Sequence, residues 1–244
     1  MGLSYDTIGI DYADLRKPDR RIAALIEQAL GPARTVLNVG AGAGSYEPAG
    51  RRVTAVEPSA GMIRQRRLPA AMVVQGRAEM LPFADRSFDA AMAVLTVHHW
   101  TDRAKGLGEM RRVTGGPVVL LTFDPAPRGF WLTDYIPALA ALDDVQMPRM
   151  ADYRRWLGPV EVTPVPIPHD CADGFLYAYW RRPAAYLDPR VRAAMSSFWA
   201  LGDVSEPLAR LADDLATGAW EARYGHLRER TEIDAGYRLV TALR

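Results

Sequence analysis

The feature that most constrains this chain is a glycine-rich turn that directly follows a short apolar run. The run covers residues 35–39, and the turn places Gly40, Gly42 and Gly44 in alternation. Glycine lets a backbone turn tightly and approach a ligand closely. Glu57 ends the next apolar run, where a carboxylate can accept hydrogen bonds from both hydroxyls of a ribose. This order predicts a parallel α/β sheet that binds a nucleoside-containing cofactor.

The spacing of the glycines distinguishes two classes of binding protein. The dinucleotide fingerprint of dehydrogenases, G-x-G-x-x-G, requires glycine at position 45, where this chain has Ser45. The observed spacing is G-x-G-x-G. Because a plain strand-to-helix turn can also contain several glycines, the rest of the sequence has to support a cofactor site.

Strands and helices alternate through the first half of the chain. We expect strands at residues 35–39, 52–56, 71–75, 88–94 and 118–123. We expect helices at residues 18–30, 59–67 and 102–113. This alternation predicts an α/β fold of the Rossmann-like, doubly wound kind, with a mostly parallel sheet of seven strands.

The pattern changes after Asp124, where prolines and a glycine interrupt the chain. Helices are expected at 131–142, at 149–157 and through much of 170–219, and the last strand at 236–243. The strand expected at 160–165 contains proline, which suits a sheet edge. The domain organisation that we predict is an N-terminal lid at 1–17, a cofactor-binding core at 18–124, a mainly helical cap at 125–234 that contributes one core strand, and a final core strand at 235–244.

Four motifs follow one another between residues 15 and 123. They are N-V-G-A-G-A-G from Asn38, V-E-P-S from Val56, G-R-A-E-M-L-P-F from Gly76 with S-F-D from Ser87, and H-H-W from His98 leading to E-M-R-R-V. In this order they resemble the class I S-adenosylmethionine (SAM)-dependent methyltransferases, in particular those of the UbiE and trans-aconitate methyltransferase kind.

The resemblance implies SAM as cofactor and S-adenosylhomocysteine as product. It implies Glu57 as the ribose acid, and Ala78 and Glu79 as the adenine contacts, because Arg77 replaces an aspartate that is frequent in the family. Asn38 replaces a family acid, so it would hold the methionine amino group as a neutral hydrogen-bonding group. The expected cofactor-binding residues are Tyr12, Arg16, Asn38, Gly40, Ala41, Gly42, Gly44, Glu57, Pro58, Met62, Ala78, Glu79 and Leu95.

Tyr12 and Arg16 belong to the N-terminal segment, which in similar enzymes folds over the cofactor as a lid. A frayed terminus is the alternative interpretation.

Methyl transfer depends mainly on alignment, and a base helps only if the acceptor carries a proton. His98 follows the fourth predicted strand, and ligands of open α/β sheets lie beyond the carboxyl ends of the strands. Histidine is a natural base near neutral pH, so we predict His98 as catalytic base. Asp124, beyond the fifth strand, is the second candidate and His99 a weaker one. The alternative is a structural role, because a His-His pair is common in the family across many acceptors.

An aromatic run in the second half suits an acceptor pocket. It contains Phe175, Tyr177, Tyr179 and Trp180, and we expect it to be helical, partly cap core and partly pocket wall for a small organic molecule. We expect methylation on oxygen or nitrogen, with oxygen slightly favoured. The nearby Cys171 is expected to be buried and inert.

Composition excludes several classes of protein. The net charge is +1, so no overall field attracts nucleic acid, and Thr96 to His99 stand where a nucleic-acid methyltransferase has an N-P-P-Y-like tetrapeptide. One cysteine and four histidines without zinc-ligand spacing predict no metal site. No long apolar stretch predicts a signal peptide or a membrane helix. Only two of the 30 basic residues are lysine, a bias typical of a GC-rich bacterium.

We therefore expect a cytoplasmic bacterial enzyme, monomeric or homodimeric, that has a small-molecule acceptor and binds neither nucleic acid nor membrane. The alternative is a SAM-binding protein of the same fold that does not transfer methyl, such as a cyclase or a regulatory sensor.

Overall fold

A computed structural model of the protein describes residues 15–67, 70–127 and 129–243. Within these ranges one sheet of seven strands has the order β3-β2-β1-β4-β5-β9-β6. Its strands are β1 (Thr35–Val39), β2 (Arg52–Glu57), β3 (Met72–Gln75), β4 (Ala90–Val94), β5 (Val118–Phe123), β6 (Glu161–Pro164) and β9 (Tyr237–Ala242). β1 to β5 are parallel, whereas β9 is antiparallel to both β5 and β6. The predicted α/β fold is confirmed, and the proline-containing strand lies at the sheet edge.

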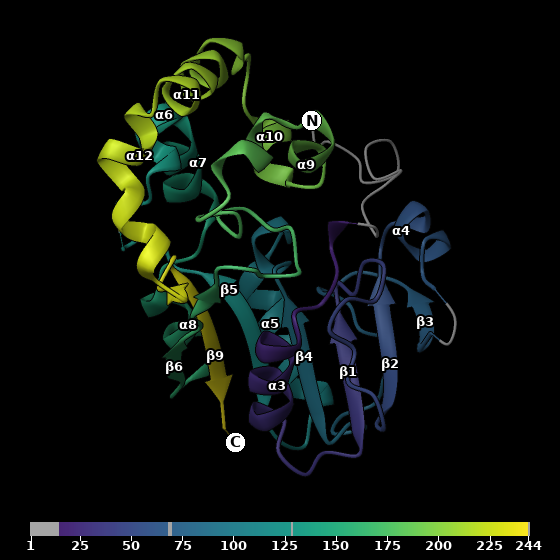
Figure 1. Ribbon diagram of the computed structural model, residues 1–244. Helices are drawn as coiled ribbons and strands as arrows, with labels where there is room; N and C mark the ends of the chain where they lie inside the picture. The colour runs from purple at the N-terminus through teal and green to yellow at the C-terminus, as the bar shows by residue number, and fades with distance from the viewer. Residues whose placement is uncertain (1–14, 68–69, 128, 244) are drawn as a thin grey trace.

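The central strands are apolar because helices cover both faces of the sheet. Successive side chains of a strand point to opposite faces. Met92 therefore packs in the cluster that contains α3 (Arg20–Ala29), and Ala93 in the cluster that contains α5 (Arg103–Val113) and α8 (Met150–Leu157). In Figure 1, α3 lies in front of the sheet. Helices therefore pack on both faces of the sheet, and the loops that follow its parallel strands lie at its carboxyl edge.

The cap departs from the prediction at two places. The helix expected at 131–142 is divided into α6 (Leu132–Tyr135) and α7 (Pro137–Gln146), because a residue before proline avoids the helical conformation and Ile136 has φ −125°. The aromatic run at 175–180 forms turns rather than a helix. Tyr177 has φ +69°, which a right-handed helix does not accommodate. A third departure lies in the core, where the short helix α4 (Ala60–Arg64) ends earlier than the expected residue 67.

The remaining cap consists of short helices around an aromatic centre. They are α9 (Pro189–Ala193), α10 (Ser196–Ala200), α11 (Ser205–Thr217) and α12 (Ala219–Tyr224). The ring of Trp131 lies 5.5 Å from that of Trp220 and 5.6 Å from that of Tyr186, in edge-to-face contacts that favour tight packing. A small ladder that the sequence did not predict joins β7 (Ile167–Pro168) to β8 (Glu232–Ile233). Figure 1 shows the cap helices standing over one end of the sheet.

The segment before α3 is joined to the cap by a short antiparallel contact. Arg16 pairs with Asp173 as an isolated β-bridge, and Nε of Arg16 lies 2.6 Å from Oδ1 of Asp173. The amide of Gly174 donates to the carbonyl of Leu15 at 2.9 Å. A Cβ at Gly174 would lie 2.8 Å from that carbonyl oxygen, so only glycine allows the approach. The contact places Arg16 beside the carboxyl ends of the strands.

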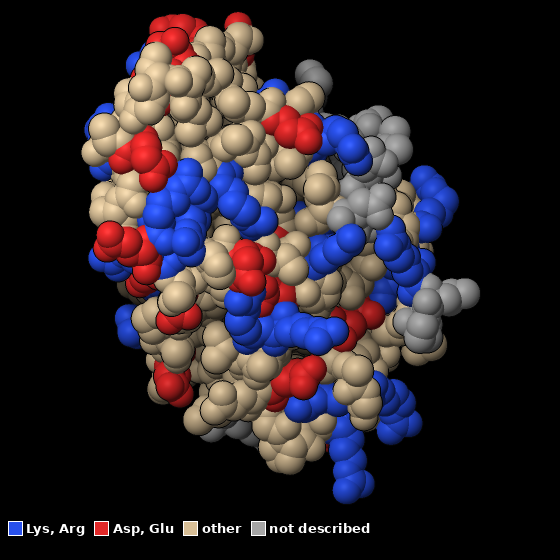
Figure 2. Space-filling view, viewed as in Figure 1, with Lys and Arg blue, Asp and Glu red and all other residues tan. Residues whose placement is uncertain are grey.

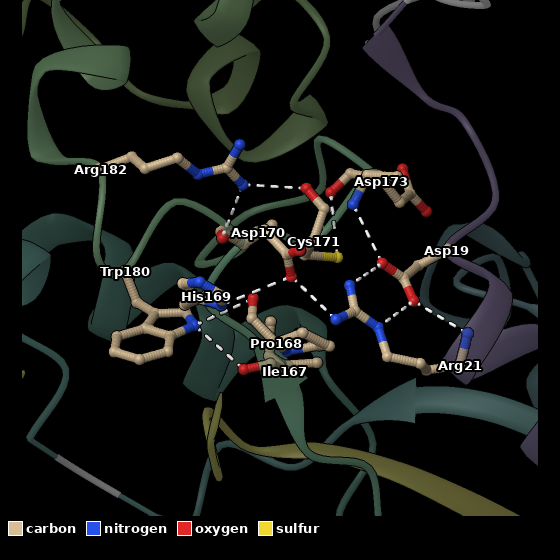
Figure 3. Close-up of polar contacts among 12 residues, drawn as sticks. Asp19, Arg21, Ile167, Pro168, His169, Asp170, Cys171, Asp173, Trp180 and Arg182 are labelled. Atoms are coloured by element: carbon tan, nitrogen blue, oxygen red, sulfur yellow. Dashed lines mark hydrogen bonds and ion pairs between the residues drawn. The ribbon is translucent and has the colours of Figure 1, made fainter. Parts of the chain in front are cut away.

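A buried carboxylate strengthens the same junction (Figure 3). Asp19, which caps α3, is 2% exposed and accepts hydrogen bonds from Arg21 at 2.8 Å and from the amide of Ala172 at 3.1 Å. Arg21 also reaches Asp170 of the cap at 2.8 Å. The hydrogen bonds from Arg21, which outweigh the opposing effect of burial, lower the pKa of Asp19 to about 2. Core and cap are therefore fixed to one another by an ionised group at neutral pH.

The surface carries mixed charge. Figure 2 shows acidic and basic side chains interspersed over one face of the molecule, without a continuous basic area. Within the described ranges, no helix has both the length and the apolar character needed to cross a membrane. Nor do three or more histidine, cysteine or acidic side chains there form a group suited to a metal ion.

Candidate active site

A cavity of about 690 Å³ opens beyond the carboxyl ends of β1, β2 and β4. We call it the outer cavity. The glycine-rich loop and the segments around residues 57–59, 77–79 and 94–101 form its walls, and Gln146 and α10 contribute from the cap. The predicted cofactor residues that it brings together are Arg16, Asn38, Gly40, Ala41, Gly42, Glu57, Pro58, Met62, Ala78, Glu79 and Leu95. Gly44 is not in this lining, and Tyr12 lies outside the described residues.

Gly40 is required by a close approach between two loops. Its φ is +69°, and an added Cβ would lie 2.3 Å from the hydroxyl oxygen of Thr96. The end of β4 therefore packs directly on the glycine-rich loop. Leu95, next to Thr96, has φ +50°, a conformation that is strained for a residue with a side chain and tends to occur at functional sites. The predicted turn and the segment leading to the histidines form a single wall.

Glu57 holds the glycine-rich loop and faces the cavity. One carboxylate oxygen accepts a hydrogen bond from the amide of Gly42 at 2.8 Å, and the other accepts from the amide of Ser59 at 2.8 Å. The residue is 6% exposed. A carboxylate offers about four acceptor positions, so a group of this kind at the cavity wall suits the hydroxyl pair of a ribose.

Asn38 provides an acceptor that fits an amino group. Its side-chain nitrogen donates to Glu47 at 3.2 Å, and Glu47 in turn binds Arg66 at 2.6 Å. These contacts orient the amide, whose buried oxygen has no hydrogen-bond partner among the described residues. An unsatisfied buried acceptor is costly, and a protonated amine would satisfy it. The geometry at Glu57 and at Asn38 is compatible with the predicted contacts to a ribose and to an amino group, and both roles stay predictions.

Glu79 has a structural role in addition to its place on the cavity wall. One of its oxygens accepts hydrogen bonds from the amides of Thr101 at 2.9 Å and Asp102 at 3.2 Å. These amides precede α5, so Glu79 fixes the loop that follows the two histidines. The predicted contact of Glu79 with adenine stays a prediction.

His98 and His99 lie on the short helical turn η1 (Val97–His99), with ring centroids 3.9 Å apart. His98 is half-buried, and desolvation by the surrounding protein lowers its pKa well below 6.5, with a further lowering by the neighbouring His99, Arg103 and Arg16. The same desolvation, with Arg16 and Arg103, lowers the pKa of His99 to about 4. Both imidazoles are therefore neutral at neutral pH, and each has one lone pair that can accept a proton.

A second cavity of about 50 Å³, the inner cavity, adjoins the outer one. Arg16, Leu95, His98, His99 and Ser196 line both. The remaining lining residues come from β5, α7 and the residue after it, the turn at 175–177, residues 195–197 and β9. They are Phe123, Asp143, Met147, Phe175, Leu176, Tyr177, Met195, Ser197 and Tyr237. The histidines thus stand at a shared wall between a large cavity and a small aromatic one.

Sequence reasoning found only part of the inner cavity. Phe175 and Tyr177 line it as expected, whereas Trp180 is buried in the cap and donates to the carbonyl of Ile167 at 3.0 Å. Asp143 was missed, although it is 3% exposed and stands one turn after the buried Leu139. The available signal was an acid directly after the expected helix at 131–142, four residues beyond Leu139 and therefore in line with its apolar face.

Asp124, the second predicted base, and Cys171 both lie outside the walls of the two cavities. Asp124 lines neither of the cavities described here; it accepts a hydrogen bond from the amide of Ala126 at 3.0 Å and lies 3.9 Å from Nε of Arg238. The geometry therefore gives no support to Asp124 as a base. Cys171 is buried as predicted, and this burial raises its thiol pKa to about 12, which keeps it unreactive.

Comparison with known proteins adds independent findings. A family model described as a methyltransferase domain matches residues 37–120. A crystal structure of a putative methyltransferase from an antibiotic biosynthesis pathway of Anabaena variabilis has a TM-score of 0.88 and 35% identity, and the match covers 94% of this chain and 99% of that one. The 4+2 cyclase SpnF shares the fold with a TM-score of 0.51 at 18% identity, over 92% of this chain and 80% of that one.

Among curated proteins, the demethylmenaquinone methyltransferase of Renibacterium salmoninarum is 37% identical over 138 residues, which is 50% of this chain and 58% of that enzyme. The chain spans about half the length of the curated relatives that it matches.

Proposed function

Since this chain belongs to the class I SAM-dependent methyltransferases, we propose that it transfers a methyl group from SAM to a small organic acceptor held in the inner cavity. The observation that carries this proposal is the shared wall of the two cavities. The outer cavity has the size and polar groups for the cofactor, and the inner one adjoins it at Leu95 and the two histidines. An acceptor placed there faces the end of the cofactor site.

The bound cofactor would supply a methyl group that is already activated as a sulfonium. The protein's part is mainly to align the two partners, because alignment contributes much of the rate of such a reaction. In this proposal Glu57 and Asn38 hold the two ends of the cofactor, and Gln146 and α10 line the same cavity from the cap side. A bound cofactor displaces water, which strengthens the remaining electrostatic interactions.

His98 accepts a hydrogen bond from the O–H or N–H of the acceptor in this proposal. Its neutral state leaves a lone pair for that purpose, and its lowered pKa makes it a weak proton acceptor before the reaction starts. The acceptor proton becomes acidic only as the new bond to the methyl carbon forms, so His98 takes it late in the step. An acceptor oxygen or nitrogen fits this scheme.

The curated relatives named demethylmenaquinone methyltransferases support an aromatic or quinone-like acceptor. The walls of the inner cavity are compatible with one, since Phe123, Phe175 and Tyr177 supply flat apolar surfaces. The volume of about 50 Å³ accommodates one edge of such a ring.

The proposal is tested by incubating the protein with SAM and a panel of hydroxylated and amino-substituted aromatic compounds. Mass spectrometry should detect S-adenosylhomocysteine together with a methylated product. If the protein binds SAM but converts a compound to a product that carries no added methyl group, methyl transfer is contradicted and the cyclase-type alternative is favoured.

A further inference from the structure

Arg103 joins the histidine turn to the cap although it lines neither cavity. One terminal nitrogen of its guanidinium donates to the carbonyl of His98 at 3.2 Å and to the carbonyl of Gln146 at 2.8 Å. His98 belongs to η1 of the core, whereas Gln146 is the last residue of α7 in the cap. Because a guanidinium holds its hydrogens in one rigid plane, these two bonds fix the separation of the two carbonyls.

Both elements that Arg103 joins contribute to the cavity walls. His98 and His99 of η1 stand at the wall that the two cavities share. The last turn of α7 contributes Asp143 to the inner cavity and Gln146 to the outer one. The separation of η1 and α7 therefore affects the space in which, under the proposed function, the acceptor meets the cofactor.

The local structure of α5 does not account for an arginine at position 103. Arg103 is the first residue of this helix, where the positive end of the helix dipole disfavours a cation. Its Nε is buried and has no hydrogen-bond partner among the described residues, which costs stability. The last carbonyls of α7, in contrast, lie at the negative end of a helix and favour a cation. The contacts with η1 and α7 are therefore the favourable ones.

The main chain before Arg103 is fixed from the cofactor side. Glu79, which lines the outer cavity, accepts hydrogen bonds from the amides of Thr101 and Asp102. Asp102 in turn caps α5 by accepting a hydrogen bond from the amide of Lys105 at 2.9 Å. The guanidinium thus extends from an anchored helix start, so its position is set by the core.

We infer that Arg103 is a positioning residue for methyl transfer, which fixes the histidine turn relative to the cap through the carbonyls of His98 and Gln146 and so aligns the acceptor with the methyl group. This inference rests on the proposed function, because it takes the acceptor to lie beside the histidines. Misalignment at a reacting centre costs rate even when its cause lies outside the site. Loss of Arg103 should therefore lower kcat and leave cofactor binding intact.

Arg103→Met and Arg51→Met form a matched pair of variants. Arg51 also donates to two backbone carbonyls, those of Ala33 at 2.9 Å and Glu27 at 3.1 Å, but lines neither cavity. With the compound of the panel that the unsubstituted protein methylates fastest, Arg103→Met should lower kcat about 10- to 100-fold. Its dissociation constant for S-adenosylhomocysteine, measured by calorimetry, should stay within about threefold. Arg51→Met should lower the urea midpoint only.

Three outcomes of this comparison would overturn the inference. They are full kcat in Arg103→Met, an equal loss of kcat in Arg51→Met, and a loss of cofactor affinity as large as the loss of kcat. The last would make Arg103 a residue of general structural importance. Arg103→Gln replaces Arg103→Met if that variant does not fold. Its side chain is shorter and neutral, so the same loss of kcat is expected, and full kcat would again overturn the inference.

Arg103→Lys separates geometry from charge. Lysine keeps the positive charge but places it on a flexible stem without a planar fork, so kcat should recover only in part. Full recovery would assign the effect to charge alone and contradict the inference.

The histidine rings provide a readout that a merely structural arginine would not change. Arg103 is one of the charges that lower the pKa of His98 and His99, together with Arg16 and after burial. In Arg103→Met, the NMR ring signals of both histidines should therefore titrate at higher pH, whereas Arg51→Met should leave them unchanged. Unchanged titrations in Arg103→Met would overturn the inference alone. Absence of a methylated product from the whole panel would overturn the proposed function and the inference together.

Discussion

The outer and inner cavities share a wall but are built in different ways. Short contiguous segments that each follow a strand form most of the outer cavity. Backbone amides of these segments, at Gly42 and Ser59, donate hydrogen bonds that orient the carboxylate of Glu57. The inner cavity collects single side chains from residues as distant as Arg16 and Tyr237. Under the proposed function, cofactor recognition is therefore local in the chain, whereas recognition of the acceptor depends on how the cap packs on the core.

The largest effect on cofactor binding is expected from a substitution in the glycine-rich loop, at Gly40, where the backbone leaves no space for a side chain. Gly40→Ala should weaken S-adenosylhomocysteine binding by at least about 100-fold, because the methyl group would collide with Thr96 and the backbone has φ +69°. Calorimetry measures the affinity and urea denaturation the stability. Gly31→Ala is the matched control, since its φ is +58° with open space around the added Cβ. Normal cofactor affinity in Gly40→Ala would show that the loop is not the cofactor site.

Removal of the loop-holding carboxylate should have the next largest effect. Glu57→Ala should weaken S-adenosylhomocysteine about 10- to 100-fold, through lost ribose hydrogen bonds and a released amide at Gly42. Asp89→Ala is the control, because Asp89 also accepts two backbone hydrogen bonds, from Arg34 and Thr35 at 2.8 Å, but lines neither cavity. It should lose stability only. The ribose assignment is wrong if both variants bind the cofactor equally well.

Gly40 and Glu57 could both be identified as candidate cofactor residues from the sequence alone. The glycine spacing and Glu57 were visible because each predicted cofactor residue lies at or just after the end of an expected strand, and parallel strands bring their carboxyl ends to one edge. Asp143 could not be placed in the same way. Its position depends on the break at Pro137 and on the backbone of Tyr177, which has positive φ. The sequence predicted an unbroken helix at 131–142 and helical structure through much of 170–219, and neither would have placed Asp143 beside Tyr177.

The junction between core and cap should show a smaller effect that does not depend on the cofactor. Asp19→Asn should lower the free energy of unfolding by about 2 kcal/mol at neutral pH, since the pKa of Asp19 is about 2 rather than 3.8. A depressed carboxylate pKa stabilises the fold above pH 3.8, and this contribution disappears as the pH falls toward 2. Urea denaturation at several pH values measures it, with the exposed partner Asp170→Asn as control. Equal stability of the two variants would exclude a role for Asp19 in joining cap and core.

The smallest effect is expected from the histidines at the shared wall. Their folded-state pKa values lie below 6.5, and that of His99 is about 4. The unfolded chain therefore binds more protons as the pH falls from 6.5 toward 4, and the fold loses stability in that interval. Water in the cavity screens part of this effect. The double variant His98→Gln and His99→Gln should flatten the dependence of the urea midpoint on pH across this interval. An unchanged slope would mean that neither ring is held neutral.

A crystal structure with S-adenosylhomocysteine tests the division into two cavities most directly. We predict that the ribose lies on Glu57, the amino group near Asn38, and the sulfur at the shared wall beside Leu95 and His98, with the inner cavity still open. The account would be contradicted if the homocysteine portion filled the space between Asp143 and Phe175, or if the molecule bound away from the glycine-rich loop.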